Sequence, residues 1–259
     1  DTVTCSAVVS DPDDEVVTPS YLWMNGVSGT TLGVGATLTL NASMIQPTEE
    51  LICEVSVSDG YGATTIQNSS ILVENTLPVI ASSSVNPQNP YNDETLACAV
   101  NATDDDGQSL SESYIWSNIS SGVVIGSGAQ LVLSSLLGMP GDIIECTATV
   151  NDGTGGEASD SSIVMIGNRP PSTPSVAIRP NPANTLSSLE CLINSATDPD
   201  GQSVSLSFAW YVNSILQPAE TAQTYGGAMS AGDNVACTVI SSDGQLFSQL
   251  GSASIVIAN

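Results

Sequence analysis

Residues 142–153 read DIIECTATVNDG, and this stretch decides the fold. Apolar and polar side chains alternate around Cys146, which predicts a half-buried β-strand. The Asp-Gly pair that ends the stretch predicts a tight turn. Similar stretches surround Cys53 and Cys237, and in all three an Asp-Gly pair begins six residues after the cysteine. One strand and its turn therefore occur three times in the chain.

The chain is an internal repeat built on its cysteines. These occupy positions 5, 53, 98, 146, 191 and 237, so successive pairs are 48, 48 and 46 residues apart. A tryptophan follows the first cysteine of each pair by 18 or 19 residues, and an asparagine follows the second by 22. Shared markers at an offset of about 93 residues predict three tandem units. We place these units at residues 1–75, 76–168 and 169–259.

Each unit reads as a series of short strands. In the second unit the predicted strands cover residues 94–102, 113–117, 123–125, 130–133, 142–150 and 161–166. No window shows a sustained helical period, and Ser, Thr and Val suit pleated, half-buried surfaces. Two cysteines with a tryptophan between them and about seven strands fit an immunoglobulin-like β-sandwich. We therefore predict an all-β chain of three such sandwiches, each with its tryptophan in the core.

The immunoglobulin-like fold places the two cysteines of a unit on strands B and F, where they form one intradomain disulfide. The predicted pairs are Cys5–Cys53, Cys98–Cys146 and Cys191–Cys237. Each pair closes a loop of nearly 50 residues, which stabilises a domain by about 4 kcal/mol if loop entropy alone counts. Such pairing favours an oxidising, extracytoplasmic setting. The alternative is three reduced, buried pairs in a cytosolic protein.

The composition excludes several functions. The chain has 27 acidic residues, two arginines, no lysine and no histidine, for a formal charge of −25. Two cations cannot follow a phosphate backbone, so we expect no nucleic-acid partner. No apolar stretch approaches the length of a membrane span. The usual histidine and lysine catalysts are missing, and the acidic groups recur in every unit rather than forming one cleft. We therefore expect no enzyme.

The turn segments carry a resemblance to a known group of repeats. Residues 53–62 and 146–153 resemble the strand F to strand G turn of bacterial and archaeal extracellular Ig-like repeats, which include PKD-like and cadherin-like families. The loop at residues 198–201 and the Asn-x-x-Pro linkers at 75–78 and 168–171 are similar too. The resemblance covers the whole chain and implies an extended surface, adhesive or fibre-forming protein.

This resemblance implies a function and a location. We expect an extracellular or cell-surface protein, and a structural segment of a filament, stalk or surface-layer-like assembly. Its partners would be copies of itself or neighbouring repeats. The alternative is an adhesin or ligand-binding module that recognises a glycan or a surface protein.

Acidic residues gather after both cysteines of each unit, and in the first unit the cluster covers residues 11–15. Strands B and F run to the same pole of a sandwich, and six residues extend roughly 20 Å. The two loops therefore meet at that pole, where the linker from the preceding unit also arrives. We call the boundary between the first and second units joint 1–2 and the boundary between the second and third units joint 2–3. The expected group in the first unit is Asp11, Asp13 and Asp59. The expected groups at the joints are Asp104, Asp106, Asp152 and Asn75 at joint 1–2, and Asp198, Asp200, Asp243 and Asn168 at joint 2–3.

Clustered carboxylates without lysine or histidine need a cation or open water. Carboxylate and amide oxygens suit Ca²⁺, so we expect calcium as the cofactor of these groups. The other interpretation is that Asp-Gly and Asp-Pro only form solvated turns. Arg169 and Arg179 flank the linker of joint 2–3. There, Arg169 either replaces part of the cation or is an exposed residue of a spacer.

The linkers are rich in proline, which predicts a semi-rigid rod. These prolines are Pro78, Pro87, Pro170, Pro171, Pro174, Pro180 and Pro182.

Two further features are expectations about the surface and the first unit. The sequons at Asn41, Asn68, Asn101 and Asn118 are candidate glycosylation sites. Subtracting 93 maps residue 94 onto residue 1, so the first unit lacks a counterpart of residues 76–93, the linker and strand A. Either the chain is a window on a longer repeat protein, or another chain supplies this strand.

Overall fold

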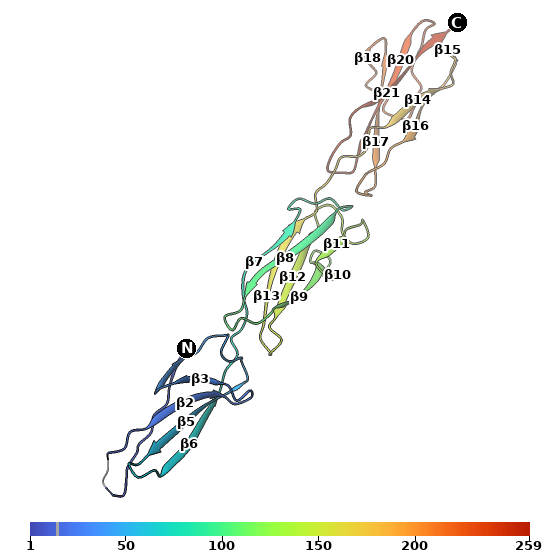
Figure 1. Cartoon of the computed structure of the whole chain (residues 1–259). Coiled ribbons are helices and arrows are strands. Elements are labelled where there is room, and N and C mark those ends of the chain that lie inside the picture. Colours follow the sequence, from blue (N-terminus) through green and yellow to red (C-terminus); the bar gives the residue numbers. More distant parts are fainter. Residues whose placement is uncertain (14–15) are drawn as a thin grey trace.

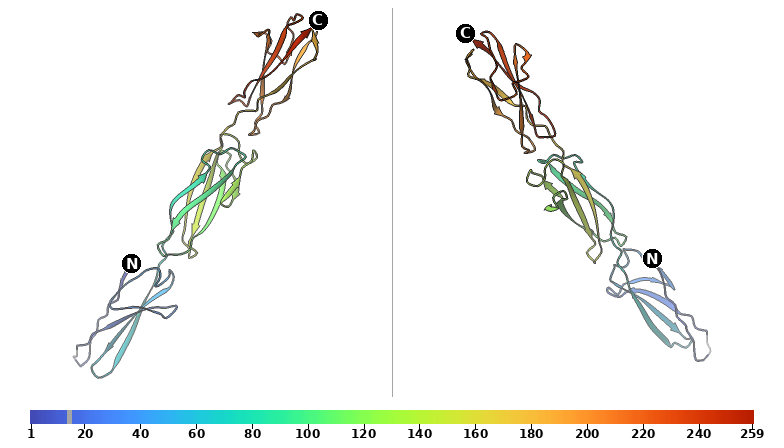
Figure 2. Two further views of the ribbon diagram at one scale, coloured as in Figure 1. Left: turned by 45° about the horizontal axis from the view of Figure 1, so that its top comes forward. Right: turned by 180° about the vertical axis from the view of Figure 1, so that it is seen from behind.

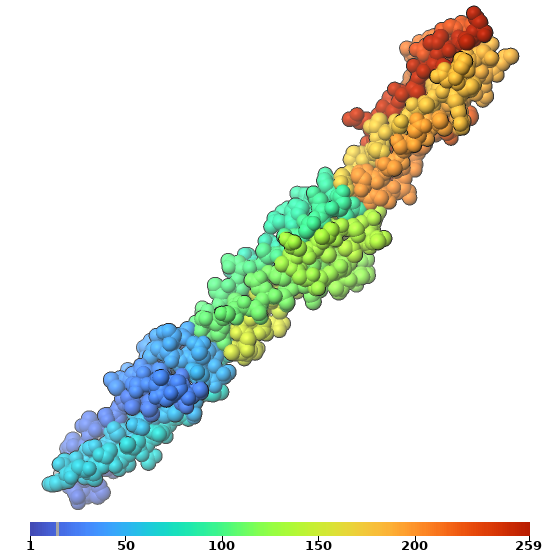
Figure 3. Space-filling view, turned by 45° about the vertical axis from the view of Figure 1, so that its right-hand side comes forward, coloured from blue at the N-terminus to red at the C-terminus, as the bar shows by residue number. Residues whose placement is uncertain are grey.

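The computed structural model describes residues 1–13 and 16–259. Asp14 and Glu15, two members of the predicted first acidic cluster, lie outside the described residues. The chain forms three β-sandwiches arranged end to end in an elongated molecule (Figures 1 and 2), and a space-filling view shows the same rod-like outline (Figure 3). In the described ranges no helix is long and apolar enough to cross a membrane. The predicted all-β fold of three tandem sandwiches is confirmed.

The first sandwich consists of two sheets with strand orders β1-β4 and β3-β2-β5-β6. Their bounds are β1 (Thr2–Thr4), β2 (Ser20–Asn25), β3 (Thr31–Val34), β4 (Thr37–Thr39), β5 (Glu50–Ser58) and β6 (Thr64–Leu72).

The second sandwich adds a strand to the smaller sheet, with orders β11-β8-β7 and β10-β9-β12-β13. Its strands are β7 (Val79–Asn86), β8 (Thr95–Thr103), β9 (Ser111–Asn118), β10 (Val123–Ser127), β11 (Gln130–Val132), β12 (Ile143–Asn151) and β13 (Glu157–Met165).

The third sandwich has the orders β14-β16-β19 and β15-β21-β20-β17-β18, with β15 parallel to β21. Its strands are β14 (Ser175–Arg179), β15 (Ala183–Asn184), β16 (Leu189–Ser195), β17 (Ser205–Val212), β18 (Ile215–Leu216), β19 (Thr224–Tyr225), β20 (Asn234–Ser242) and β21 (Gly251–Ala258).

A disulfide and a tryptophan form the centre of each core. The three predicted disulfides, Cys5–Cys53, Cys98–Cys146 and Cys191–Cys237, are present. Trp116 and Trp210 are fully buried and Trp23 is nearly so. Each indole N–H donates to the backbone carbonyl twelve residues later, at 2.8–2.9 Å, so none of the three indole donors is left unpaired. The predicted core role of the tryptophans is confirmed.

The strands of the second sandwich follow the predicted pattern with one notable difference. β13 begins at Glu157, four residues before the predicted start at residue 161. All nine residues of β12 pair with β13, so the hairpin stays paired up to its turn.

The proline-rich linkers are shorter than predicted. Pro87 directly follows β7, Pro180 directly follows β14, and Pro182 directly precedes β15. These three prolines therefore lie inside the second and third sandwiches, and the prediction that they belong to spacers between domains is wrong. Proline cannot donate a ladder hydrogen bond, which explains its place at strand ends.

We predict that the Cys98→Ala/Cys146→Ala variant destabilises the second sandwich by about 2–4 kcal/mol, because the unfolded loop is no longer restrained. Hydrogen exchange of the β12 amides measures this change. The β20 amides of the third sandwich, which keep their disulfide, are the internal control. Equal protection of β12 in the variant and the parent chain would contradict the prediction.

Candidate functional site at the domain joints

The linker after β6 meets the loops of the second sandwich at joint 1–2. The Asn75 side chain donates to Asp152 Oδ2 at 2.7 Å and accepts from the Thr154 hydroxyl at 2.7 Å. The next backbone N–H, of Thr76, donates to Asp106 Oδ2 at 2.6 Å. The structure thus brings Asn75, Asp106 and Asp152 to one joint, as the strand geometry predicts.

The β12–β13 turn holds Asp152 in a fixed position. Its Oδ1 accepts the backbone N–H groups of Thr154 and Gly156 at 2.7 and 2.9 Å, and the residue is 5% exposed. The hydrogen bond from Asn75, with these backbone bonds, outweighs burial and lowers the pKa of Asp152 to about 2. A Cβ atom on Gly156 would collide with the Asp152 carboxylate, which explains the glycine there.

Joint 2–3 repeats the same two hydrogen bonds. Asn168 donates to Asp243 Oδ2 at 3.0 Å, and the backbone N–H of Arg169 donates to Asp200 Oδ2 at 2.6 Å. Burial alone would raise the pKa of Asp243. Hydrogen bonds outweigh this effect of burial; they come from the backbone N–H groups of Leu246 and Gln245 and from the Asn168 side chain. The pKa of Asp243 therefore lies below its usual value.

A glycine of the incoming loop packs on the preceding sandwich at both joints. A Cβ built on Gly107 would lie 3.2 Å from Ala42 Cβ, and one on Gly201 would lie 3.4 Å from Ser135 Cβ. Ala42 and Ser135 are counterparts at the offset of 93 residues. The two joints therefore share linker bonds and a packing contact.

Arg169 adds a further link that only joint 2–3 shows. Its guanidinium lies 2.7 Å from Asp200 of the third sandwich and 3.1 Å from Asp93 of the second, and 4.7 Å from the centre of the Tyr91 ring. Asn92 donates to the backbone carbonyl of Asp200 at 2.7 Å. With its side chain 24% exposed, Arg169 bridges two domains, and the interpretation as an exposed spacer residue is wrong.

Arg179 does not belong to this joint. It lies at the end of β14 and pairs with Glu190 of β16 at 2.6 Å, within the third sandwich. The strand carries Arg179 away from the linker, so its predicted place beside the carboxylates of joint 2–3 is wrong.

The carboxylates do not form a three-member cluster. Among residues 1–13 and 16–259, no group of three His, Cys, Asp or Glu side chains is placed to hold a metal ion. Several of the carboxylate oxygens already accept hydrogen bonds from backbone N–H groups, as at Asp106, Asp152 and Asp200. The predicted grouping of three carboxylates at each joint is therefore wrong, while calcium binding itself stays a prediction.

Both joints nevertheless contain buried oxygens without a hydrogen-bond partner. In the described ranges these are Asp104 Oδ2, Gln108 Oε1, Asn168 Oδ1, Asp198 Oδ2 and Gln202 Oε1. Asp104 and Asp198 are counterparts in the repeat, as are Gln108 and Gln202. All five atoms are carboxylate or amide oxygens, the donor set that Ca²⁺ prefers. The types of atom present therefore suit such a cation, with one carboxylate and one or two amide oxygens at each joint.

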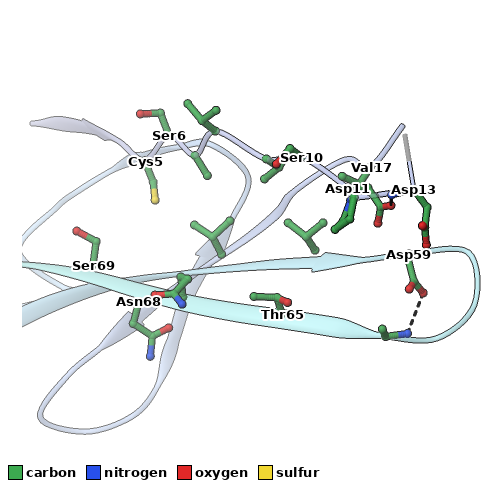
Figure 4. A pocket seen from close by; sticks show the side chains of 18 residues that line it. Cys5, Ser6, Ser10, Asp11, Asp13, Val17, Asp59, Thr65, Asn68 and Ser69 are labelled. Atoms are coloured by element: carbon green, nitrogen blue, oxygen red, sulfur yellow. Dashed lines mark hydrogen bonds between the residues drawn. The ribbon is translucent and has the colours of Figure 1, made fainter. Parts of the chain in front are cut away.

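The third predicted group lies at the far pole of the first sandwich. Asp11, Asp13 and Asp59 appear together at one end of a pocket in Figure 4. Asp11 accepts the backbone N–H of Asp13 at 2.8 Å, and Asp59 accepts those of Tyr61 and Ala63 at 2.9 and 2.8 Å. These bonds are turn chemistry, as the alternative interpretation expects.

The predicted glycosylation sites differ in accessibility. Asn41, Asn68 and Asn101 are exposed, whereas Asn118 is 3% exposed. The Asn118 amide donates to the Leu137 carbonyl and to Asp142 at 3.0 and 2.9 Å. A glycan cannot be attached to this nitrogen in the folded domain, so that predicted site is wrong.

Asn118 belongs to a structural pair that the sequence prediction missed. Each sandwich contains an asparagine that donates to a carboxylate four residues before the second cysteine. The pairs are Asn25–Glu49, Asn118–Asp142 and Asn213–Asp233. The recurring acidic residue at that spacing was a usable signal, since it occurs in all three units.

Comparisons with known proteins give no family and two distant likenesses among solved structures. No protein-family model and no curated protein matches it. It is 10% identical to the FN1–FN3 domains of chicken CNTN1, with a TM-score of 0.30 over 93% of this chain and 90% of that one. It is 12% identical to the three N-terminal domains of the Highly Immunogenic Outer Capsid protein (Hoc) of bacteriophage RB49, with a TM-score of 0.28 over 99% and 93%. At these values neither likeness carries information about function.

We predict that Asn75→Ala raises the pKa of Asp152 from about 2 toward its ordinary value of 3.8, because Asn75 is the largest cause of the shift. A depressed folded-state pKa stabilises the fold above about pH 4, and this stabilisation is lost as the pH falls toward 2. The variant should therefore show less of this loss. An NMR titration of the Asp152 carboxyl carbon measures the pKa.

The matched control is Asn168→Ala, which removes the equivalent bond at joint 2–3. It should raise the pKa of Asp243 and leave that of Asp152 unchanged. A pKa of Asp152 that stays near 2 in Asn75→Ala would show that the linker bond does not hold this carboxylate.

Proposed function

We propose that the chain is a structural spacer, a stiff segment of an extracellular filament, stalk or surface-layer-like protein. One observation carries this proposal: both joints use the same linker bonds, Asn75–Asp152 and Asn168–Asp243, with the following backbone N–H on Asp106 or Asp200. A contact set repeated at each joint favours a repeated orientation, which a spacer requires. Flexible tethers do not need side chains that lock the linker.

An extracellular setting is supported by the disulfides. Each sandwich contains one, and no cysteine of the described residues is free. Such bonds persist in oxidising compartments and are rare in the cytosol. The exposed sequons at Asn41, Asn68 and Asn101 are compatible with that setting.

The second candidate is an adhesin or ligand-binding module. The exposed Val8 and Tyr61 of the first sandwich favour it, because apolar and aromatic side chains offer contact area to a partner. The two functions differ in assembly. A filament segment forms regular self-assemblies in electron micrographs without a partner, whereas an adhesin stays monomeric and binds a glycan or a surface protein.

We predict that Arg169→Ala loosens joint 2–3. Asp200 is 1% exposed, and one of its carboxylate oxygens loses its side-chain donors, which costs about 1–3 kcal/mol. Negative-stain images should then show a broader distribution of angles between the second and third domains. The matched control is Arg179→Ala, which removes the same side chain from a pair within one domain and should leave the angles unchanged. Equal distributions in both variants would contradict a rigid joint.

We further propose that Ca²⁺ binds at both joints. The support is the set of orphaned oxygens at equivalent positions, Asp104 and Gln108 in one joint and Asp198 and Gln202 in the other. A bound cation would satisfy buried acceptors that otherwise cost about 1–3 kcal/mol each. At joint 2–3 Arg169 pairs with Asp200 and Asp93, so the arginine would replace the cation at Asp200 while the ion would bind the orphaned oxygens.

We predict that Ca²⁺ raises the thermal unfolding temperature and that a chelator reverses the rise, because an ion that binds only the folded state stabilises it. Asp104→Asn and Asp198→Asn should each reduce the number of ions measured by calorimetry. Asp93→Asn, a joint carboxylate outside the set, is the matched control. If the chelator changes neither the unfolding temperature nor the hydrodynamic length, calcium is not the cofactor.

A further inference from the structure

The first sandwich has an uncovered sheet edge where the other two carry a strand. In the second sandwich β7 pairs along β8, and in the third β14 pairs along β16. Within the described part of the first sandwich, β1 pairs with β4 alone, and residues 6–10 belong to no strand. Their counterparts, residues 99–103, form the half of β8 that pairs only with β7. The irregular backbone at residues 6–10 therefore matches the lack of a β7-like partner.

An apolar residue is also exposed along this uncovered edge of the first sandwich. Ile71 of β6 is 51% exposed, whereas its counterparts Val164 and Ile255 are 4% and 7% exposed. In the second sandwich β7 packs beside β13, the strand that contains Val164. The surface that β7 covers there is open to solvent in the first sandwich.

Two cavities continue along this edge. One of about 600 Å³ is lined by residues 5–13 and by side chains of β5 and β6, with Cys5 and Ser69 toward one end and Asp59 at the other (Figure 4). The other, of about 830 Å³, lies toward joint 1–2 and is lined by Val3, Ile71 and the linker. Together they follow the path of the missing strand.

We propose that the first sandwich accepts a β-strand of the type of β7 and β14, paired antiparallel with residues 4–10. The register follows from the complete sandwiches, where the residue opposite the first cysteine is Val85 or Ile178. These side chains are 0% and 7% exposed. The accepted strand therefore places a buried, β-branched residue opposite Cys5.

Polar contacts define the strand further. Ser83, two residues before Val85, donates to Asp160 at 2.6 Å and lies 2.9 Å from the Ser162 hydroxyl. The counterparts of Asp160 and Ser162 are Gln67 and Ser69, and both line the first cavity. The accepted strand thus has a small hydroxyl residue at the position of Ser83.

Charge restricts the strand as well. The far end of the first cavity is lined by Asp11, Asp13 and Asp59. An acidic residue of the accepted strand would be repelled by these carboxylates. β7 itself reads VIASSSVN and carries no charged residue. The accepted strand therefore carries no acidic residue along its paired length, as in β7 and β14, where the one charged residue is Arg179.

The occupant is a strand from outside these 259 residues and not a second copy of them. β7 and β14 are already paired within their own sandwiches, and lending either would uncover a second core. A strand that continues like residues 87–93 would also reach joint 1–2. At joint 2–3 that segment supplies Tyr91, Asn92 and Asp93 to the domain contact.

The test uses a labelled peptide with the sequence of residues 78–93 and the full chain. We expect saturable one-to-one binding by fluorescence anisotropy and slower hydrogen exchange at residues 6–10. Val85→Asp in the peptide should weaken binding by at least about tenfold, since it places a charge in the core. Ile71→Asp in the chain should do the same, while unchanged protection of β5 shows that this variant remains folded.

Leu136→Asp is the matched control, because Leu136 is 94% exposed on the second sandwich and should not affect binding. Absence of saturable binding up to about 1 mM peptide, the upper end of weak affinities, would overturn the proposal. Equal binding of the Val85→Asp peptide would overturn it too. A dimer of the chain with protected residues 6–10 in sedimentation and exchange experiments would make a second copy the occupant, which also contradicts it.

Discussion

The disulfide between the first and second cysteine of each unit is the constraint on which the rest of the structure depends. It joins β8 to β12 in the second sandwich and β16 to β20 in the third. Because both strands then run six or seven residues to the same pole, the loop with Asp106 and the turn with Asp152 meet there. The joint is thus a consequence of the core.

This arrangement explains the unusual charge of the chain. With two arginines and no lysine, the chain can neutralise few of its 27 acidic groups with its own cations, so most of the carboxylates at the joints and turns accept hydrogen bonds instead. Asp152 is held by an amide and two backbone N–H groups, and Asp142 by Asn118 and the backbone N–H of Met139. Only Asp200, Asp93 and Glu190 pair with arginine in the described residues. Five buried carboxylate or amide oxygens at the joints have no hydrogen-bond partner in the described residues, and a bound cation would satisfy them.

The sequence predicted what depends on periodic, local signals. The three units, the disulfides and the core tryptophans follow from spacing, and the meeting of Asn75 with Asp152 follows from strand direction. The bridge from Arg169 to Asp93 and Tyr91 could not be predicted, because it depends on how a loop of one sandwich faces the next. The burial of Asn118 was missed because a sequon is read without knowledge of its neighbours.

The central claim is that repeated contacts hold the three sandwiches in fixed orientations. Residual dipolar couplings, measured by NMR on the intact chain in a weakly aligning medium, test it most directly. A rigid chain gives one alignment tensor for all three domains. Three tensors of different magnitude, each fitting only its own domain, would show that the joints are flexible and would contradict the account.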